Sequence, residues 1–201
     1  MNSLVNRGKN MVKKTVKLVA FAGSTRKDSL NKKLVKIAAM GATTAGADVT
    51  YIDLKDYAMP LYDGDLEAEG GYPEAAIALK KLFQESDGFL IASPEYNSGY
   101  SAVLKNTIDW ISRPTSKDEP ALSAFAGKHA SIMAAAPGAL GGLRGLYQLR
   151  ELLMNINVTV LPKMQAVSHS FKAFDDKGQL LDEKMSSTVK SLGEQIVKAV
   201  I

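Results

Sequence analysis

The chain has 201 residues, of which 46% are hydrophobic and 23% are charged, and its formal net charge is +4. The length suits one compact domain, and the composition is that of a globular protein, which excludes a disordered or fibrous chain. No apolar run is long enough to span a bilayer, and the absence of cysteine excludes disulfides and thiolate chemistry, so we expect a cytoplasmic protein that does not enter a membrane.

The positive charge is concentrated at the amino terminus. Five of the 25 basic residues lie in the first 17 positions, which contain no acidic residue, so the rest has 20 basic residues against 21 acidic ones. We expect no secretory signal here, because the first apolar stretch runs into a polar loop and not into a small-residue cleavage site. We interpret residues 1–14 as a basic tail before a nearly neutral domain at 15–201. Nucleic-acid binding through this tail is the less favoured interpretation.

Short apolar segments rich in β-branched residues alternate along the chain with longer segments of helical period. The expected strands are residues 16–22, 49–52, 88–93, 130–135 and 158–161. Between and after them, apolar residues recur every three or four positions and indicate five helices. This alternation predicts an α/β fold, a doubly wound five-stranded parallel sheet of order 2-1-3-4-5 with helices on both faces.

In such a sheet, ligands bind beyond the carboxyl ends of the strands, where the strand order reverses. The candidate binding loops are therefore the first loop (residues 23–31), the second loop (93–99) and the third loop (136–142), which follow the expected strands 1, 3 and 4. Residues 55–71 and 113–127 form two further long loops, and long loops often make the rims of sites.

The first loop combines hydroxyl side chains, a glycine, an arginine and the start of a helix. Backbone N–H groups at a helix N-terminus can hold a phosphate, and hydroxyl and amide side chains donate further bonds to it. Arg26 adds a planar fork with a permanent charge. Ser29 and Asn31 could equally cap a helix in a loop that binds nothing. The common dinucleotide and P-loop motifs are absent, which disfavours those two kinds of site.

The second loop begins with Ser-Pro-Glu-Tyr-Asn at residues 93–97. Pro94 restrains the backbone, so that an extended turn can present main-chain groups to a ligand. The pyrimidine edge of an isoalloxazine ring has donors and acceptors that such groups and Asn97 could match, and Tyr96 offers an aromatic wall. On spacing alone, an ordinary turn between a strand and a helix is the better interpretation.

Taken together, the motifs resemble one known family. The pattern G-S-x-R-x-x-S-x-N-x-x-L at residues 23–34, the second-loop turn and the segment L-K-N-T-I-D-W at 104–110 are similar to the NADPH-dependent FMN reductases. They most resemble the branch that contains soluble quinone, azo-dye and chromate reductases. The resemblance runs from about Val16 to the final helix. It implies a flavodoxin-like fold, FMN as cofactor, NADPH or NADH as electron donor, and a small-molecule electron acceptor.

The resemblance also implies which residues hold the cofactor. The first loop would bind the FMN phosphate, and the second would border the isoalloxazine ring. The third resembles a glycine-rich loop that often starts with serines and flanks the flavin, but Ala136 stands at its start, so backbone donation around Gly138 is expected instead. The cofactor-binding residues implied are Ser24, Arg26, Ser29, Leu30, Asn31, Pro94, Glu95, Tyr96, Asn97, Ala136 and Gly138.

No residue is assigned a catalytic role, because the flavin itself supplies the redox chemistry and the protein binds and orients. Asp109 and Trp110 are interpreted as packing beside the site. His129 and His169 lack neighbours at metal-ligand spacing, so no metal is expected. The alternative function is that of an FMN-binding electron carrier that does not itself oxidise NAD(P)H, which the nearly neutral body disfavours.

The resemblance further implies a homodimer or homotetramer with the flavin sites near the subunit boundary. Side chains of the kinds enriched in interface cores occur in the rim segments, namely Met59, Leu61, Tyr62, Tyr72 and Tyr100. Arg144 and Tyr147 could add a polar contact across a two-fold axis. These side chains could instead close the flavin pocket within one chain.

Overall fold

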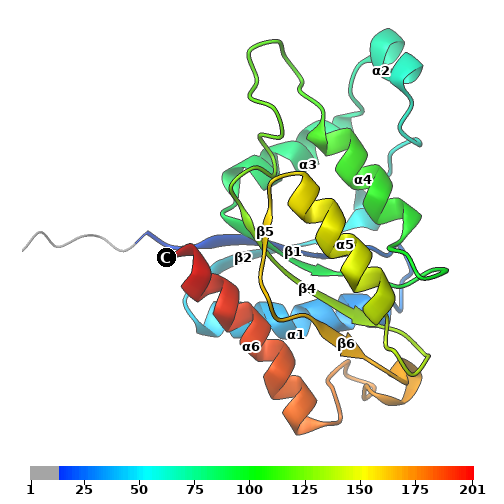
Figure 1. Ribbon diagram of the computed structural model, residues 1–201, viewed down its shortest axis with the longest axis vertical. Coiled ribbons are helices and arrows are strands. Elements are labelled where there is room, and N and C mark those ends of the chain that lie inside the picture. The colour runs from blue at the N-terminus through cyan, green and yellow to red at the C-terminus, as the bar shows by residue number, and fades with distance from the viewer. Residues whose placement is uncertain (1–13) are drawn as a thin grey trace, which may run out of the picture.

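Six parallel strands form one sheet in the computed structural model, which describes residues 14–201 (Figure 1). They are β1 (Lys17–Ala22), β2 (Asp48–Asp53), β3 (Gly88–Ala92), β4 (His129–Ala135), β5 (Thr159–Val160) and β6 (Gln165–Val167). Their order is β2-β1-β3-β4-β5, and β6 also pairs with β4. This confirms the flavodoxin-like α/β fold that the sequence predicts.

The two central strands, β1 and β3, are buried along their whole length except at Lys17. Their nearly continuous apolar sequences suit strands that are covered by helices on both faces. The pairing of Ala22 with Ala92 brings both strands to an end at the same level of the sheet. The first and second loops therefore leave the sheet side by side.

The outer strand of the sheet differs from the prediction of one strand at residues 158–161. Two short strands share this position, β5 beside the start of β4 and β6 beside its end. Pro162 lies in the break, since a proline has no N–H to donate to a sheet. The carbonyl groups of Leu161 and Pro162 accept hydrogen bonds instead from the guanidinium of Arg150, at 2.9 and 2.8 Å.

Helices cover both faces of the sheet, and each face has its own hydrophobic cluster. One face is covered by α1 (Leu30–Thr44) and α6 (Glu183–Val200), and the other by α3 (Glu74–Glu85), α4 (Ala102–Ser112) and α5 (Leu143–Asn155) (Figure 1). The helices α1 and α6 meet backbone to backbone. A Cβ atom at Gly193 would lie 2.0 Å from the carbonyl oxygen of Ala38, so this contact requires glycine.

The long segment at 55–71 contains structure that the sequence does not predict, the end of a 3-10 turn (Leu54–Asp56) and the short helix α2 (Gly64–Gly70). None of the residues of α2 is buried, and the helix projects from the body of the domain (Figure 1). Within residues 14–201, no helix has the length and apolar character needed to cross a membrane.

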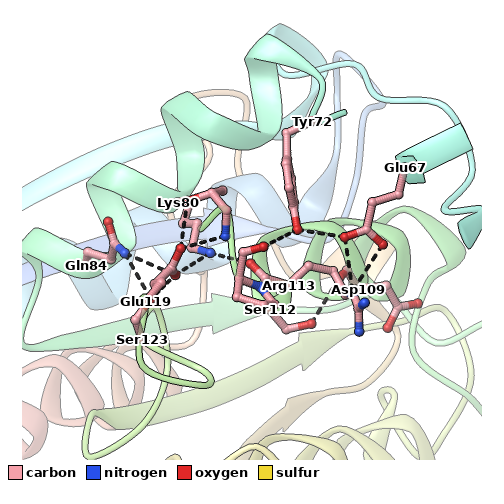
Figure 2. A network of polar contacts seen from close by, with 11 residues as sticks. Glu67, Tyr72, Lys80, Gln84, Asp109, Ser112, Arg113, Glu119 and Ser123 are labelled. Carbon is pink, nitrogen blue, oxygen red and sulfur yellow. Dashed lines mark hydrogen bonds and ion pairs between the residues drawn. The ribbon is translucent and has the colours of Figure 1, made fainter. Parts of the chain in front are cut away.

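Polar contacts fasten both long loops to the helical layer (Figure 2). Glu67 of α2 accepts hydrogen bonds from the hydroxyls of Tyr62 and Tyr72, at 2.8 and 2.6 Å, and from the guanidinium of Arg113. In the other long segment, residues 113–127, Glu119 forms an ion pair with Lys80 of α3, and both side chains are largely buried. These polar contacts add to the apolar packing of the two segments, in which Phe125 is buried in the core and Tyr62 packs against Trp110.

The predicted basic tail at residues 1–14 lies outside the described residues, apart from its last member. The ammonium group of Lys14 pairs with the carboxylate of Asp87 at 2.6 Å, and the same carboxylate accepts a hydrogen bond from the backbone N–H of Lys17. The chain therefore enters β1 at the amino edge of the sheet, at the opposite end from the three candidate loops.

Candidate cofactor-binding cleft

An open cleft lies at the carboxyl ends of β1, β3 and β4. The cleft has a volume of about 170 Å³. Its lining residues are Ser24, Arg26, Ser29, Leu30, Asn31, Pro94, Glu95, Tyr96, Ala135, Ala136, Pro137, Ser170 and Phe171. Nine of the eleven predicted cofactor-binding residues are among them. The other two, Asn97 and Gly138, line an adjoining hollow that shares Glu95, Ala136 and Pro137 with the cleft.

The first loop follows directly from the pairing of β1 with β3. The N–H of Gly23 donates to the carbonyl of Ala92 at 2.8 Å, which extends the sheet by one residue. A Cβ atom at Gly23 would lie 2.9 Å from the hydroxyl of Ser101, and that hydroxyl donates to the Gly23 carbonyl at 2.6 Å. Glycine is thus required here because the first turn of α4 lies against the loop.

The start of α1 faces the cleft. Ser29 is its N-cap, and the Ser29 hydroxyl accepts a hydrogen bond from the N–H of Lys32 at 3.4 Å. The first turn of α1 contains no acidic residue, so nothing within it offsets the positive end of the helix dipole. Ser24 is buried beside this turn, and Arg26 is exposed at the rim of the cleft. Such an arrangement favours an anion such as a phosphate.

Asn31 lies in the cleft, but its side chain already has two partners. Its Nδ2 atom donates to the carbonyl of Ala135 at 3.0 Å, and its Oδ1 atom accepts from the N–H of Ala135 at 2.9 Å. The amide therefore joins the first loop to the end of β4. The backbone N–H of Asn31 lies in the first turn of α1, where N–H groups have no carbonyl partner within the helix. It is therefore the group of Asn31 that can donate to a ligand.

The second loop ends in a tight turn from Tyr96 to Gly99. These two residues exchange backbone hydrogen bonds of 2.9 and 3.0 Å, and the residues between them, Asn97 and Ser98, have φ angles of 51° and 68°. Two left-handed residues in succession are typical of a type I′ turn, in which asparagine is among the favoured residues and serine is not. The turn presents Asn97 and Ser98 to the adjoining hollow and leaves the Tyr96 ring 54% exposed at the cleft.

Glu95 fastens the second loop to α5. Its carboxylate accepts a hydrogen bond of 2.8 Å from Nη2 of Arg144 and one of 2.9 Å from the N–H of Gly145. The N-cap of α5, Gly142, has no side chain to cap the helix, so Glu95 takes this role from another loop. Burial alone would raise the pKa of Glu95, but the bonds from Gly145 and Arg144 together lower that pKa. Arg144, predicted at a subunit contact, thus has a partner within its own chain.

The third loop carries its predicted residues at the surface of the cleft and the hollow. Ala136 is half-buried and Gly138 is exposed. The loop returns to the sheet through Gly141 and Gly142, whose φ angles of 62° and 95° lie in the left-handed region. A Cβ atom at Gly142 would lie 2.6 Å from that of Ala134, so the close return of the loop depends on glycine.

Four lining residues are not among the predicted ones. Ala135 and Pro137 flank the predicted Ala136, whereas Ser170 and Phe171 begin a 3-10 turn (Ser170–Lys172) after β6. No motif marks Ser170 or Phe171. The signal that could have found them is topological, because this turn follows a strand that ends at the same edge of the sheet as β1, β3 and β4.

Asp109, Trp110 and His129 are not among the residues that line the cleft. Asp109 pairs with Lys105 of the same helix at 2.6 Å, with both side chains partly exposed, and the buried Trp110 donates from Nε1 to the carbonyl of Pro60 at 2.8 Å. His129 begins β4 at the opposite end of the sheet. Within residues 14–201, no group of three or more histidine or acidic side chains is placed to hold a metal ion.

Comparison with known proteins agrees with this geometry. Residues 16–173 match the family described as NADPH-dependent FMN reductase. An NAD(P)H-dependent FMN reductase of Pseudomonas aeruginosa is 35% identical over 176 residues, which cover 87% of this chain and 90% of that protein. An NAD(P)H:quinone oxidoreductase of Solanum tuberosum is 34% identical over 183 residues, which cover 88% and 89%.

A solved structure extends the similarity to three dimensions. The flavoenzyme FerB, an NAD(P)H:(acceptor) oxidoreductase of Paracoccus denitrificans, matches with a TM-score of 0.74 and 27% identity, over 92% of this chain and 97% of FerB. The resemblance drawn from the sequence motifs is confirmed, and the chain belongs to the NADPH-dependent FMN reductase family.

Proposed function

We propose that this protein holds FMN in the cleft and passes electrons from NAD(P)H to a small oxidised acceptor, such as a quinone, an azo compound, free flavin or chromate. The observation that carries the proposal is the meeting of three loops, far apart in the sequence, at one cleft. One part of that cleft offers the start of α1 with Ser24 and Arg26, and another offers Pro94 and Tyr96.

The residues present fit the two chemical ends of FMN. A phosphate is matched by the uncompensated first turn of α1, by the hydroxyl of Ser24 and by the guanidinium of Arg26. A flat aromatic ring is matched by Pro94 and by the exposed ring of Tyr96, with polar groups of the second and third loops beside them. These two halves would be held at a fixed separation, because Asn31 and Glu95 bond the loops to the sheet and to α5.

Bound FMN supplies the redox chemistry, since a flavin accepts a hydride and returns electrons to an acceptor. The residues of this chain bind and orient. Because the cleft is open, NAD(P)H and the acceptor can use the same space in turn, which is a ping-pong order. On this proposal the acceptor is chosen by the shape and polarity of that space, and no side chain needs to transfer a proton.

The test starts from purified protein reconstituted with FMN. We expect a yellow protein that is bleached anaerobically by NADPH or NADH and regains its colour with a quinone. In steady-state assays, double-reciprocal plots at several acceptor concentrations should be parallel lines. Flavin that stays yellow with both nucleotides would indicate an electron carrier, and protein that takes up no FMN would overturn the proposal. Converging lines would exclude the ping-pong order but not the transfer of electrons itself.

We also propose a homodimer or homotetramer. Leu61 is 77% exposed on the segment that leads to α2, and Tyr147 and Met154 of α5 are 60% and 58% exposed. Such large apolar side chains favour association when they are gathered on a surface. The other rim residues named above, Met59, Tyr62, Tyr72 and Tyr100, pack in part against the core of their own chain and contribute less. A monomer mass in light scattering of the FMN-loaded protein would exclude this assembly.

A further inference from the structure

Phe171 is the more exposed of the two aromatic side chains that line the cleft. It lies there with residues of the first, second and third loops, and it is 71% exposed. The sequence motifs do not include it. A large apolar side chain that is exposed by itself on a protein surface is common and needs no explanation. Phe171 differs from that ordinary case in its backbone, in its packing and in its neighbours.

The backbone on both sides of Phe171 is held in place. Ser170, directly before it, is fully buried, and the N–H of Ser170 donates to the carbonyl of Ala136 in the third loop at 3.3 Å. The N–H of Lys172, directly after it, donates to the carbonyl of His169 at 2.9 Å and closes the 3-10 turn. A ring that is carried on such a fixed turn is already positioned for a ligand, so binding costs little ordering of the chain.

The ring of Phe171 takes no part in the hydrophobic core. Among residues 14–201, it belongs to neither hydrophobic cluster, and it is not one of the partly buried side chains that pack against them. Phe174, three residues further along the chain, does pack against the cluster beneath α1 and α6. The same segment thus directs one phenylalanine to the core and leaves the other at the cleft. Packing of the fold does not account for Phe171.

A second exposed ring lines the same cleft. Tyr96 is 54% exposed and belongs to the loop after β3, whereas Phe171 belongs to the turn after β6, and β4 pairs with both of these strands. The two rings therefore come from segments on either side of the third loop. Leu30, Pro94 and Pro137 also line the cleft. This apolar and aromatic part of the lining suits a flat apolar group better than a charged one.

We propose that Phe171 is a further binding residue of the cleft, whose side chain packs against the flat conjugated ring of a bound molecule. This inference rests on the proposed function, which brings such rings into the cleft, either in FMN itself or in the nicotinamide or quinone that enters afterwards. The chemistry of the side chain does not suit the phosphate. A phenyl group has no hydrogen bond to donate and would displace water from that charge, whereas it gains free energy by covering a flat apolar surface.

The test compares the wild-type protein with Phe171→Ala and with Phe171→Tyr, which keeps the ring. Leu181→Ala is the matched control, because Leu181 is 64% exposed but does not line the cleft. Dissociation constants of the flavin-free protein for FMN and for riboflavin, which lacks the phosphate, are measured by quenching of flavin fluorescence. With FMN in excess, KM and kcat are then measured for NAD(P)H, for a quinone and for ferricyanide, a small acceptor without a conjugated ring.

We expect a change of roughly tenfold in Phe171→Ala, since covering a phenylalanine ring contributes at least the 1.4 kcal/mol that corresponds to a factor of ten. A ring that packs on the flavin would raise the dissociation constants for FMN and riboflavin together. A ring that packs on a substrate would raise KM for NAD(P)H or the quinone and leave that for ferricyanide unchanged. Phe171→Tyr and Leu181→Ala should keep every constant within about twofold.

The proposal is overturned if every constant in Phe171→Ala equals that of the wild type, or if Leu181→Ala has the same effect. A loss for FMN that riboflavin does not share also overturns it, because the contact would then be to the phosphate. The melting temperature of flavin-free Phe171→Ala should be unchanged, and a lower one would show that the ring supports the fold instead. Wild-type protein that takes up no FMN would refute the proposed function, whereas an effect missing only in the variant refutes this inference alone.

Discussion

Asn31 and Ala135 exchange two hydrogen bonds, of 3.0 and 2.9 Å, between a side-chain amide and a strand backbone. The amide takes the place of a neighbouring strand at the last residue of β4, where β3 has already ended. The contact carries no charge and is buried, and it joins the first loop to the third across the sheet edge.

Replacing Asn31 by alanine should therefore lower both the stability of the fold and the affinity for FMN. The substitution leaves the N–H and C=O of Ala135 without partners in a buried place, and each such group costs about 1–3 kcal/mol. We expect the free energy of unfolding of the flavin-free protein to fall by about 2–4 kcal/mol in urea titrations. Asn31→Asp should also destabilise, because a carboxylate oxygen would face the Ala135 carbonyl. An unchanged urea midpoint in both variants would show that the pairing contributes nothing.

Arg26→Ala, in contrast, should weaken FMN binding without lowering the stability of the fold. The side chain is exposed and lines the cleft, so the proposed phosphate contact is its main role. FMN binding should weaken by about 1.5–3 kcal/mol, the usual range for a hydrogen bond to a charged group. Isothermal titration with FMN measures this change, with Lys27→Ala, an exposed neighbour outside the cleft lining, as the control. Equal affinities in a folded Arg26→Ala protein would remove Arg26 from the site.

These two variants illustrate what sequence reasoning could and could not supply. It placed both residues at the cleft, because the order of strands determines which loops share an edge. It could not separate their roles, since whether an amide is free or bonded to Ala135 depends on where β3 ends relative to β4. Ser170 was missed because its turn carries no motif. The helix α2 was missed because none of its residues is buried, so it shows no apolar period.

The ion pair between Lys80 and Glu119 predicts a dependence of stability on pH. Burial alone would raise the pKa of Glu119, but hydrogen bonds from Lys80, Ser123 and Thr115 lower that pKa to about 2. Because the pKa is lower in the folded state than in the unfolded state, the pair contributes stability above about pH 4.3. This contribution should be lost as the pH falls from there toward the folded-state value.

The comparison that isolates this pair is wild type against Glu119→Gln, followed by urea unfolding between pH 2.5 and 7. At neutral pH the variant should be less stable by about 3 kcal/mol, the low end for a broken buried pair, since the glutamine oxygen can still accept from Lys80. The difference between the two proteins should shrink as the solution becomes more acidic than about pH 4.3. A difference that is constant over the whole range would contradict the assignment.

The backbone contact of α1 with α6 gives a prediction about packing. In Gly193→Ala the new methyl group would lie 2.0 Å from the carbonyl oxygen of Ala38, so the helices must separate. We expect the free energy of unfolding to fall by about 3 kcal/mol or more, the upper part of the range for overpacked cores. Gly64→Ala is the matched control, because nothing lies within 4 Å of a Cβ atom there. Equal melting temperatures for the two variants would refute the close contact.

The break between β5 and β6 has a consequence for how copies of this protein meet. A long, uninterrupted edge strand is a template on which another chain can add a strand, and natural proteins avoid this with short strands and prolines. Here the outer edge consists of strands of two and three residues around Pro162, and Arg150 already occupies two of its carbonyl groups. That side of the molecule is closed to intermolecular β-sheet growth. Any self-association on that side must therefore use side chains on the helices. A strand from another copy cannot add to this edge, because the edge offers no continuous row of backbone hydrogen-bonding groups.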